Sequence, residues 1–268
     1  MHRSVESFYY CFMLAVKKIR ADMLLLEREL AESRSQAQAL ILAGKVRMQA
    51  DDVVAKPSQM ISSGAILQLA SAPKFVSRGG EKLEAFLAKF SVDVSGKHAL
   101  DVGASTGGFT DCLLQCGAAT VTCVDVGHGQ LHYKLQKDAR VRNIERLHAK
   151  DISKDNLGRI HFDVIVVDVS FISLKKILPH VGSFLSKNGI LVALIKPQFE
   201  AEKSIMDRCK GVLKDTSLQE KLRDEIIDFA LKHLGNGVLV GVMDSPLLGT
   251  RGNREFLMGL ERRCPCVA

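Results

Sequence analysis

Short apolar runs recur along most of this chain, and β-branched side chains are frequent in them. Such runs are typical of strands buried in a parallel sheet, and they predict strands at 99–102, 121–126, 143–147, 162–168, 189–195 and 237–242. Between them, apolar side chains recur with helical spacing, which predicts helices at 82–90, 109–116, 128–135, 174–185 and 218–234. A final strand is predicted to open at 252–256. This alternation predicts an α/β fold with a doubly wound, mostly parallel sheet.

A smaller pattern precedes this sheet. Asp22 is predicted to cap a first helix over 24–30. Ser33 and Gln36 form a capping box for a second helix, which Gly44 ends. The strands predicted to follow lie at 45–48 and 65–69. Two short helices with small strands predict a compact α+β module, too small to bury a large core of its own.

Proline marks the end of this module, because Ser71-Ala72-Pro73 follows its last strand. The predicted organisation is an N-terminal extension at 1–16, a small domain at 17–73, a larger domain at 74–262 and a tail at 263–268. The extension is apolar at 7–16, but this stretch is too short to span a bilayer and no small-residue cleavage site follows it. We hypothesise that the natural start is Met13, which gives a basic N-terminus.

The amino-acid composition indicates what kind of partner the protein can bind and in which redox compartment it is expected. The 268 residues include 37 basic and 30 acidic side chains, and the formal charge of +7 is compatible with an acidic partner such as nucleic acid. The seven cysteines are odd in number and show no paired CxxC spacing. This pattern argues against a disulfide framework or a zinc site, and it predicts reduced thiols in a cytoplasmic protein.

A turn with three glycines at 103–109 links the first strand of the large domain to a helix. Glycine lets the backbone approach a ligand, and the start of the helix offers N–H groups to an anion. Asp125 ends the next strand, where a carboxylate can accept ribose hydroxyls. A dinucleotide site requires glycine at the position that Ser105 occupies here. The turn therefore favours S-adenosylmethionine, which has no pyrophosphate, over a nicotinamide dinucleotide or an ordinary strand–helix turn.

Charged side chains stand at the ends of other predicted elements. Asp168 ends one buried strand and Lys196 ends the next, so the two are expected side by side at the carboxyl edge of the sheet. Lys82 opens a helix, where a cation opposes the helix dipole, so an acidic partner is expected for it. Glu255 precedes the final strand. Asp151 also follows a strand, where it could meet an adenine amino group or remain a solvated loop carboxylate.

The small domain resembles a known RNA-binding domain. Its pattern Ser-Arg-x-x-Ala-x-x-Leu-Ile-x-x-Gly-x-Val at 33–46 is similar to the domain named after ribosomal small-subunit protein S4. Charge alone favours a solvated helix face, because residues 1–75 hold ten basic and seven acidic side chains. The family's Asn-Gly turn is replaced here by Gln49-Ala50-Asp51-Asp52. The residues predicted to bind RNA are Arg28, Ser33, Arg34, Lys45, Arg47 and, in the larger domain, Arg78.

Several longer motifs extend the resemblance over about residues 17–260. The chain contains, in order, SRGGEKLE, DVGASTGGFTDCLL, DVGHGQL, DVSFISL, LIKPQFEA and GNREFL. These motifs, with the Lys–Asp–Lys–Glu set, resemble the hemolysin-A-type (TlyA) family of ribosomal RNA methyltransferases, whose catalytic domain is FtsJ-like. The resemblance implies an S-adenosylmethionine-dependent enzyme that methylates a ribose 2′-hydroxyl, that of a cytidine, in the RNA of ribosomal subunits. It implies neither a metal nor a membrane partner, and a monomer is expected.

The resemblance also implies roles for individual residues. The predicted catalytic set is Lys82, Asp168, Lys196 and Glu255. The predicted cofactor-binding set is Gly103, Ser105, Thr106, Gly107, Gly108, Phe109, Asp125 and Asp151. Lys196 is the central group, either as a neutral amine that removes the ribose proton or as a cation that stabilises the oxyanion. Asp168 would orient Lys196, and Glu255 would position Lys82 or the ribose.

Three alternatives belong to other functional classes. A membrane-lytic hemolysin would lyse vesicles without any cofactor, and a ribosome-binding factor without catalysis would bind RNA without methyl transfer. A nicotinamide oxidoreductase would bind NAD tightly, which Ser105 disfavours.

Overall fold

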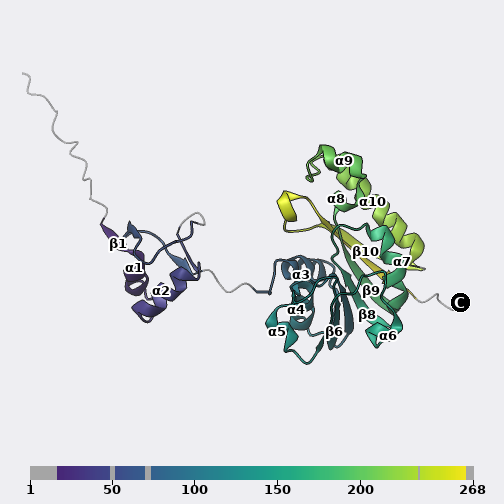
Figure 1. The fold of residues 1–268 in the computed structure, drawn as a ribbon, viewed down its shortest axis with the longest axis horizontal. Coiled ribbons are helices and arrows are strands. Elements are labelled where there is room, and N and C mark those ends of the chain that lie inside the picture. Colours follow the sequence, from purple (N-terminus) through teal and green to yellow (C-terminus); the bar gives the residue numbers. More distant parts are fainter. Residues whose placement is uncertain (1–16, 49–51, 70–73, 235, 264–268) are drawn as a thin grey trace, which may run out of the picture. The chain divides into compact units, whose positions relative to one another are not determined.

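The computed structural model describes residues 17–48, 52–69, 74–234 and 236–263. The chain divides into two compact units, Met1–Ala72 and Pro73–Ala268 (Figure 1). Each unit has hydrophobic core residues of its own. Four sequence predictions lie outside the described residues: the extension at 1–16, the start at Met13, the turn at 49–51 and most of the C-terminal tail.

The first unit packs two short helices against two small sheets. Its elements are β1 (Lys18–Arg20), α1 (Ala21–Glu27), α2 (Arg34–Leu42), β2 (Val46–Arg47), β3 (Met60–Ser62) and β4 (Gln68–Leu69). β1 pairs with β3 and β2 pairs with β4, and both pairs are antiparallel. Leu24, Leu25 and Ile41 are buried in the core that joins the helices to the strands. The predicted helix–helix–strand order of this module is confirmed, although the strands are shorter than expected.

The N-terminus of α2 is capped in part as the sequence predicts. The Ser33 hydroxyl accepts a hydrogen bond from the Gln36 backbone N–H at 3.2 Å. The Gln36 side chain, however, accepts from the Glu32 N–H at 2.6 Å and not from that of Ser33. The reciprocal half of the predicted capping box is therefore wrong, since the amide reaches one residue further back.

Asp22 does not cap α1 as predicted. It lies in the first turn of that helix and is buried, with its carboxylate 2.8 Å from Arg20 and 3.2 Å from Arg34. Hydrogen bonds from Arg20, Gln38 and Arg34 hold the pKa of Asp22 well below its usual range against the effect of burial. In the folded protein, Asp22 is therefore a buried counter-ion of two arginines and not a helix cap. One of these arginines is Arg34, which the sequence predicts to bind RNA.

A seven-stranded sheet forms the centre of the second unit. Its strands are β5 (His98–Val102), β6 (Thr120–Val124), β7 (Val141–Ile144), β8 (Phe162–Val167), β9 (Leu185–Ile195), β10 (Gly237–Asp244) and β11 (Phe256–Arg262). They lie in the order β10-β11-β9-β8-β5-β6-β7. The strands from β5 to β9 pair in parallel, whereas β11 is antiparallel to both of its neighbours. The predicted α/β fold with a mostly parallel sheet is confirmed.

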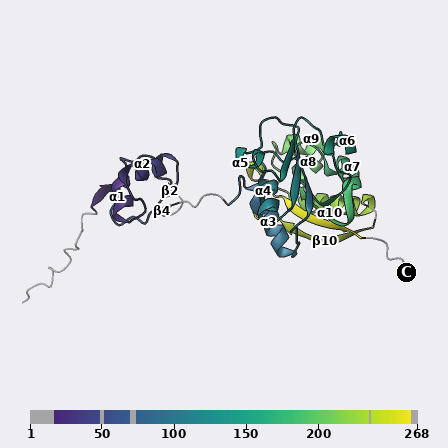
Figure 2. The ribbon, with the colours of Figure 1, turned by 90° about the horizontal axis from the view of Figure 1, so that it is seen from below.

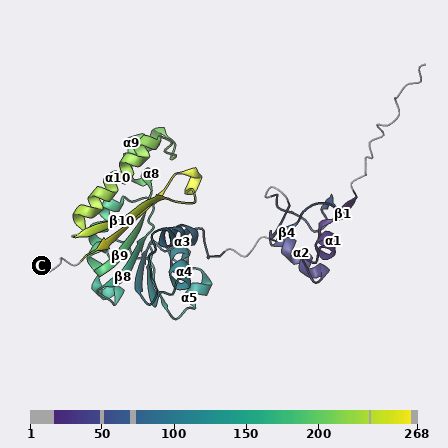
Figure 3. The same cartoon turned by 180° about the vertical axis from the view of Figure 1, so that it is seen from behind.

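Helices cover both faces of this sheet, as Figure 1 and Figure 2 show. The helices on one face are α3 (Gly79–Lys89), α4 (Gly108–Gln115) and α5 (Tyr133–Gln136). The helices on the other face are α6 (Lys154–Leu157), α7 (Leu178–Val181) and α10 (Thr216–His233), which Figure 3 shows from behind. Two hydrophobic clusters, one beneath each helical layer, fill the space between helices and strands. The strand order reverses at β5, so a crevice is expected beyond the carboxyl ends of β5 and β8.

Two predicted helices are wrong in part. Only Tyr133–Gln136 of the helix expected at 128–135 is helical, because Glu145 accepts bonds from the His128 ring at 2.6 Å and the Gly129 N–H at 3.0 Å. These two bonds hold the preceding residues as a loop. The helix expected at 174–185 is broken into η2 (Leu174–Lys176), α7 and η3 (Gly182–Phe184). Pro179 opens α7, since it has no N–H with which to continue the preceding turn.

Candidate active site

The carboxyl ends of β5, β8 and β9 lie side by side, and they carry Asp101, Asp168 and Lys196. A cavity of about 280 Å³ opens at this edge of the sheet. Of the predicted catalytic residues, those that line the cavity are Lys82, Asp168 and Lys196. Of the predicted cofactor-binding residues, those that line it are Gly103, Ser105, Thr106, Gly108 and Phe109. The fold thus brings members of both predicted sets to one space, although Glu255, Gly107, Asp125 and Asp151 do not line it.

Lys196 is held at this cavity by two partners on the loop after β8. Its Nζ lies 2.5 Å from Asp168 Oδ1 and donates a hydrogen bond to Ser170 Oγ at 2.9 Å. The Phe199 ring centroid lies 6.0 Å from the same nitrogen. The expected contact between Lys196 and Asp168 is therefore present. The hydrogen bond to Ser170, which the sequence did not predict, further fixes the orientation of the Lys196 side chain. A nitrogen held in this way can act on an oxygen atom placed in the cavity.

Lys82 forms the second lysine–carboxylate pair of the site. Its Nζ lies 2.6 Å from Glu255 Oε2, and Glu255 is only 3% exposed. α3 begins at Gly79, so Lys82 lies in its first turn with a buried side chain and not at a solvated helix start. Glu255 is thus the acidic partner expected for Lys82. Glu255 does not itself line the cavity, but it contacts Lys82, which does.

The glycine turn adopts left-handed backbone at three residues. The φ angles are +87° at Gly103, +48° at Ser105 and +93° at Gly107. A Cβ atom on Gly103 would lie 2.4 Å from the backbone oxygen of Asp168, so only glycine fits there. The Gly107 N–H donates to the Ala104 carbonyl at 2.7 Å, so this expected free donor is occupied. The anion site predicted at the helix start is therefore left to the residues of α4 that follow Gly107.

Asp125 fixes the glycine turn in place. Its two carboxylate oxygens accept the backbone N–H groups of Ser105 at 2.8 Å and of Gly127 at 2.7 Å. Each carboxylate oxygen has a second lone pair, so Asp125 can still accept ribose hydroxyls. Asp151 is exposed on the loop after β7 and does not line the cavity. The structure therefore brings Asp125 to the turn, but it does not bring Asp151 into the cavity.

Asp101 is a site residue that sequence reasoning missed. It lies near the end of β5, is fully buried and lines the cavity. The Thr110 hydroxyl donates to its Oδ2 atom at 2.7 Å, while Oδ1 has no hydrogen-bond partner in the part of the chain that the structure describes. Burial raises the pKa of Asp101 to about 7, although the bond from Thr110 opposes the shift. Its place two residues before Gly103, the first glycine of the turn, was the available sequence signal.

Phe171 was missed as well. It lies one residue after Ser170, is 90% exposed and adopts a φ of +64°. Its ring lies 4.9 Å from that of Phe199, at an angle of 49°. The two rings thus form an exposed aromatic surface beside Lys196. The signal was an aromatic residue within the motif DVSFISL, three residues after the predicted catalytic carboxylate of Asp168.

The predicted RNA-binding residues fall in both units. Arg78 lines the cavity of the second unit, whereas the other five residues lie in the first unit. Within that unit, Ser33 caps a helix and the Arg28 guanidinium donates to the Ser63 carbonyl at 3.1 Å. Lys45 is exposed between α2 and β2. Arg28, Arg34 and Arg78 are exposed as well, so exposure does not single out one cation of this set.

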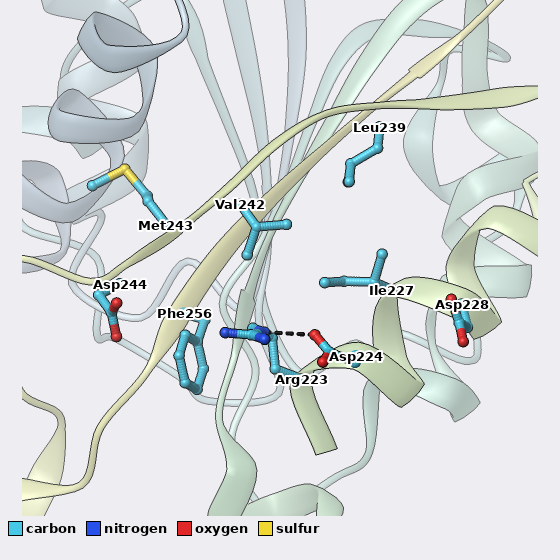
Figure 4. Close-up of a pocket in the computed structure, with 9 residues that line it drawn as sticks. All are labelled: Arg223, Asp224, Ile227, Asp228, Leu239, Val242, Met243, Asp244 and Phe256. Carbon is cyan, nitrogen blue, oxygen red and sulfur yellow. Dashed lines mark hydrogen bonds and ion pairs between the residues drawn. The ribbon is translucent and has the colours of Figure 1, made fainter. Parts of the chain in front are cut away.

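A second cavity, of about 380 Å³, lies between α10 and the β10–β11 pair. Figure 4 shows Ile227, Leu239 and Val242 around it, with Arg223 paired to Asp224. None of the predicted catalytic or cofactor-binding residues lines this cavity. The chemistry is therefore concentrated at the other cavity. Within the described ranges, the structure contains no helix of the length and apolarity needed to cross a bilayer.

Comparison with known proteins agrees with this geometry. Residues 75–262 match the family described as FtsJ-like methyltransferase. Hemolysin A of Brachyspira hyodysenteriae is 44% identical over 84% of this chain and 92% of its own length. The protein named 16S/23S rRNA (cytidine-2′-O)-methyltransferase TlyA of Mycobacterium tuberculosis is 40% identical over 91% of this chain and 90% of its own length.

A solved structure extends the similarity to the fold. A hemolysin-named protein from Streptococcus thermophilus superposes with a TM-score of 0.69 and 39% identity, covering 92% of this chain and 90% of the other. The matched family spans the whole sheet and every predicted catalytic residue. The chain therefore belongs to the FtsJ-like methyltransferase family and, at this level of identity, to its hemolysin A and TlyA group.

Proposed function

We propose that this protein transfers a methyl group from S-adenosylmethionine to the 2′-hydroxyl of a cytidine ribose in ribosomal RNA. The observation that carries the proposal is the pairing of Lys196 with Asp168 and of Lys82 with Glu255 beside one glycine turn. The relative named as a 16S/23S rRNA (cytidine-2′-O)-methyltransferase, 40% identical to this chain, supports this substrate.

The residues at this edge fit S-adenosylmethionine. The cofactor has an amino-acid end, a ribose and an adenine, and no pyrophosphate. The first turn of α4 would hold its carboxylate, because helix N-termini attract anions. Asp125 would accept its ribose hydroxyls through the lone pairs that Ser105 and Gly127 leave free. When bound, the cofactor supplies an electrophilic methyl group to the cavity.

The lysines and carboxylates would prepare the attacking oxygen. A ribose 2′-hydroxyl is a weak acid, so negative charge that develops on its oxygen must be stabilised where it forms. Lys196 Nζ, directed by Asp168 and Ser170, would bind this oxygen and either accept its proton as a neutral amine or stabilise its negative charge as a cation. Lys196 Nζ and Asp168 Oδ1 lie only 2.5 Å apart, so the proton that leaves the ribose hydroxyl is assigned to the pair and not to one of the two residues. Lys82, held by Glu255, would orient the ribose.

The surface beside the lysines suits a nucleic acid. Phe171 is exposed next to Ser170 and packs on Phe199, so it offers a face on which an unpaired base can stack. Arg78 lines the same cavity and is exposed, so it can reach a phosphate. The net charge of +7 favours association with a polyanion. These features support an RNA substrate over a small hydroxylated molecule.

The first test is methyl transfer to unmodified ribosomal subunits. Purified protein is incubated with each subunit and with S-adenosylmethionine labelled in its methyl group, and the label is mapped to nucleotides. We expect label on the 2′-oxygen of a cytidine. The Lys196→Ala variant should lose at least about 100-fold in rate, because one preorganised donor to a developing oxyanion contributes that much. Lys187→Ala is the matched control, since it removes an exposed lysine from the far end of the same strand.

Each possible outcome tests a different part of the proposal. Label on ribosomal RNA with full activity of Lys196→Ala would remove Lys196 from the mechanism. Label on a base nitrogen or carbon would exclude 2′-O transfer. If the protein binds S-adenosylhomocysteine but labels neither subunit, ribosomal RNA in assembled subunits is not the substrate. If it binds no cofactor, the methyltransferase proposal fails.

A further inference from the structure

Glu200 is a partly buried carboxylate that joins two segments of the candidate active site. It ends α8 (Pro197–Glu200), the short helix that directly follows Lys196. Its Oε2 atom accepts the Ser173 hydroxyl at 2.5 Å, and its Oε1 atom accepts the Leu174 backbone N–H at 2.8 Å. Burial raises the pKa of Glu200, whereas these two bonds lower it. Both carboxylate oxygens are thus used to hold the end of the loop that follows β8.

The same two segments also contact each other at the central lysine. Lys196 Nζ lies 2.5 Å from Asp168 Oδ1 and 2.9 Å from Ser170 Oγ. The rings of Phe171 and Phe199 lie 4.9 Å apart. Asp168 is also fixed by the sheet, since its backbone N–H donates to a carbonyl of β5 at 3.0 Å. The loop beyond Asp168 is therefore held against the segment after β9 by Lys196 at its start and by the carboxylate of α8 at its end.

Phe171 gives this loop a conformation that needs support. Its φ of +64° is a left-handed backbone, which is unfavourable for a residue with a Cβ atom. Its side chain is 90% exposed, so burial does not compensate for this strain. The two hydrogen bonds of Glu200 go to the second and third residues after Phe171. They fix the far end of the loop, so that the strained residue cannot relax by moving that end.

We propose that Glu200 is a positioning residue for methyl transfer, which holds the loop 168–174 so that Ser170 and Phe171 keep their places beside Lys196. This inference rests on the proposed function, because its consequence is the placement of the ribose oxygen against Lys196. Glu200 does not line the cavity, and its two hydrogen bonds go to the loop after β8 and not to the glycine turn. The rate of methyl transfer should therefore depend on Glu200, whereas the affinity for the cofactor should not.

The test separates the reach of this side chain from its charge. Glu200→Gln keeps the reach and removes the charge, because an amide can accept the Leu174 N–H and donate to the Ser173 hydroxyl. Glu200→Asp keeps the charge and shortens the reach by about 1 Å, a displacement that can cost about 100-fold in rate. We expect kcat for methyl transfer to ribosomal subunits to fall about 10- to 100-fold in Glu200→Asp and to stay within about threefold of the wild type in Glu200→Gln. The Kd for S-adenosylhomocysteine should stay within about twofold in both full-length variants.

Hydrogen exchange reports on the loop directly and needs no substrate. The Leu174 N–H should exchange about tenfold faster in Glu200→Asp than in the wild type, and it should stay protected in Glu200→Gln. Glu225→Gln is the matched control. Glu225 also binds this turn, with Lys175 Nζ at 3.1 Å, but through an exposed ion pair, which contributes little. This variant should leave the rate, the Kd and the exchange unchanged.

The outcomes distinguish this inference from the proposed function. A full rate in Glu200→Asp, or an equal loss in Glu200→Gln, would show that the reach of the side chain does not matter and would overturn the inference. Loss of S-adenosylhomocysteine binding in Glu200→Asp would overturn it as well, because Glu200 would then support the fold as a whole. If the wild type labels neither subunit, the proposed function fails by its own test. The exchange of Leu174 then still decides whether Glu200 fixes the loop, because unchanged exchange in Glu200→Asp would exclude it.

Discussion

At the scale of single residues, protonation of Asp101 in the cavity makes the stability of the ligand-free protein depend on pH. Burial raises its pKa from 3.8 to about 7, with smaller contributions from the carboxylates of Asp168 and Asp125 and an opposing bond from Thr110. The folded state therefore binds more protons than the unfolded state between these values. The contribution of Asp101 to stability is fully present below the unfolded pKa and is lost as pH rises through the folded pKa.

This sign gives a measurable prediction for the Asp101→Asn variant, which cannot ionise. From pH 6 to pH 8, the free energy of unfolding of the wild type should fall by about 1.4 kcal/mol relative to the variant, because a folded-state pKa of about 7 leaves an excess of about half a proton on average over two pH units. Urea denaturation at pH 6, 7 and 8 measures the difference. Parallel pH profiles for the two proteins would show that Asp101 is already ionised throughout this range in the folded state, as it is in the unfolded state.

At the scale of elements, the segment between β10 and β11 positions Glu255. It includes η4 (Thr250–Gly252) and turns back at Asn253, which is buried. The Asn253 amide accepts the Leu213 N–H and donates to the Gly211 carbonyl, both at 3.1 Å. The segment is thereby tied to the chain between α9 (Lys203–Arg208) and α10. The buried side-chain amide of Asn253, two residues before Glu255, thus links two loops that lie far apart in the sequence.

Gly249 lies in this segment, directly against the carboxylate of Glu255. A Cβ atom there would lie 1.9 Å from Glu255 Oε1, so Gly249→Ala should displace the carboxylate from Lys82. We expect methyl transfer to slow by about 100-fold, as a displacement of about 1 Å can cause, with cofactor affinity unchanged. Steady-state rates and calorimetric binding separate the two effects.

Gly64→Ala provides the control for this prediction. Its added Cβ would meet only an ordinary contact, at 3.6 Å from Ser62 Oγ in the first unit. It should therefore leave both measurements unchanged. Normal activity of Gly249→Ala would show that Glu255 can move without effect on Lys82.

At the scale of the whole molecule, the two units have separate cores. The apolar clusters of the second unit lie within 75–260, and that of the first unit lies within 19–67. We propose that the first unit is an RNA-binding domain and the second a methyltransferase domain that folds independently. A fragment of residues 74–268 should then bind S-adenosylhomocysteine with a Kd within about twofold of the full chain, because all its proposed cofactor ligands are present.

The same fragment should methylate ribosomal subunits poorly. The first unit holds the proposed RNA contacts apart from Arg78 and Phe171, so its loss should lower kcat/KM for the RNA at least about tenfold, equivalent to about 1.4 kcal/mol of binding. Radiolabel transfer at several subunit concentrations measures this value. Full activity of the fragment would contradict an RNA-binding role for the first unit.

Local sequence patterns were sufficient for most elements and for the candidate residues of the site. The β-branched runs predicted strands that are all present, because burial on both faces requires continuous apolar sequence. The three glycines followed by a helix, with Asp125 after the next strand, predicted the ligand-binding turn. Lys82, Asp168, Lys196 and Glu255 were predicted to converge because they end or open elements, and such ends meet at one edge of a parallel sheet. Their catalytic roles were implied by the resemblance to the methyltransferase family. These signals depend on neighbours in sequence, so they could be read directly.

The tertiary structure decided how those residues are paired. Only the fold shows that Glu255 reaches Lys82 across 173 positions, and that Ser170 shares Lys196 with Asp168. The unsatisfied oxygen of Asp101 and the exposed ring of Phe171 also depend on packing between distant segments. The antiparallel place of β11 and the interruption of the helix at 174–185 were likewise not predicted. Burial and partner choice are properties of the folded chain, whereas strand and turn patterns are already present in the sequence.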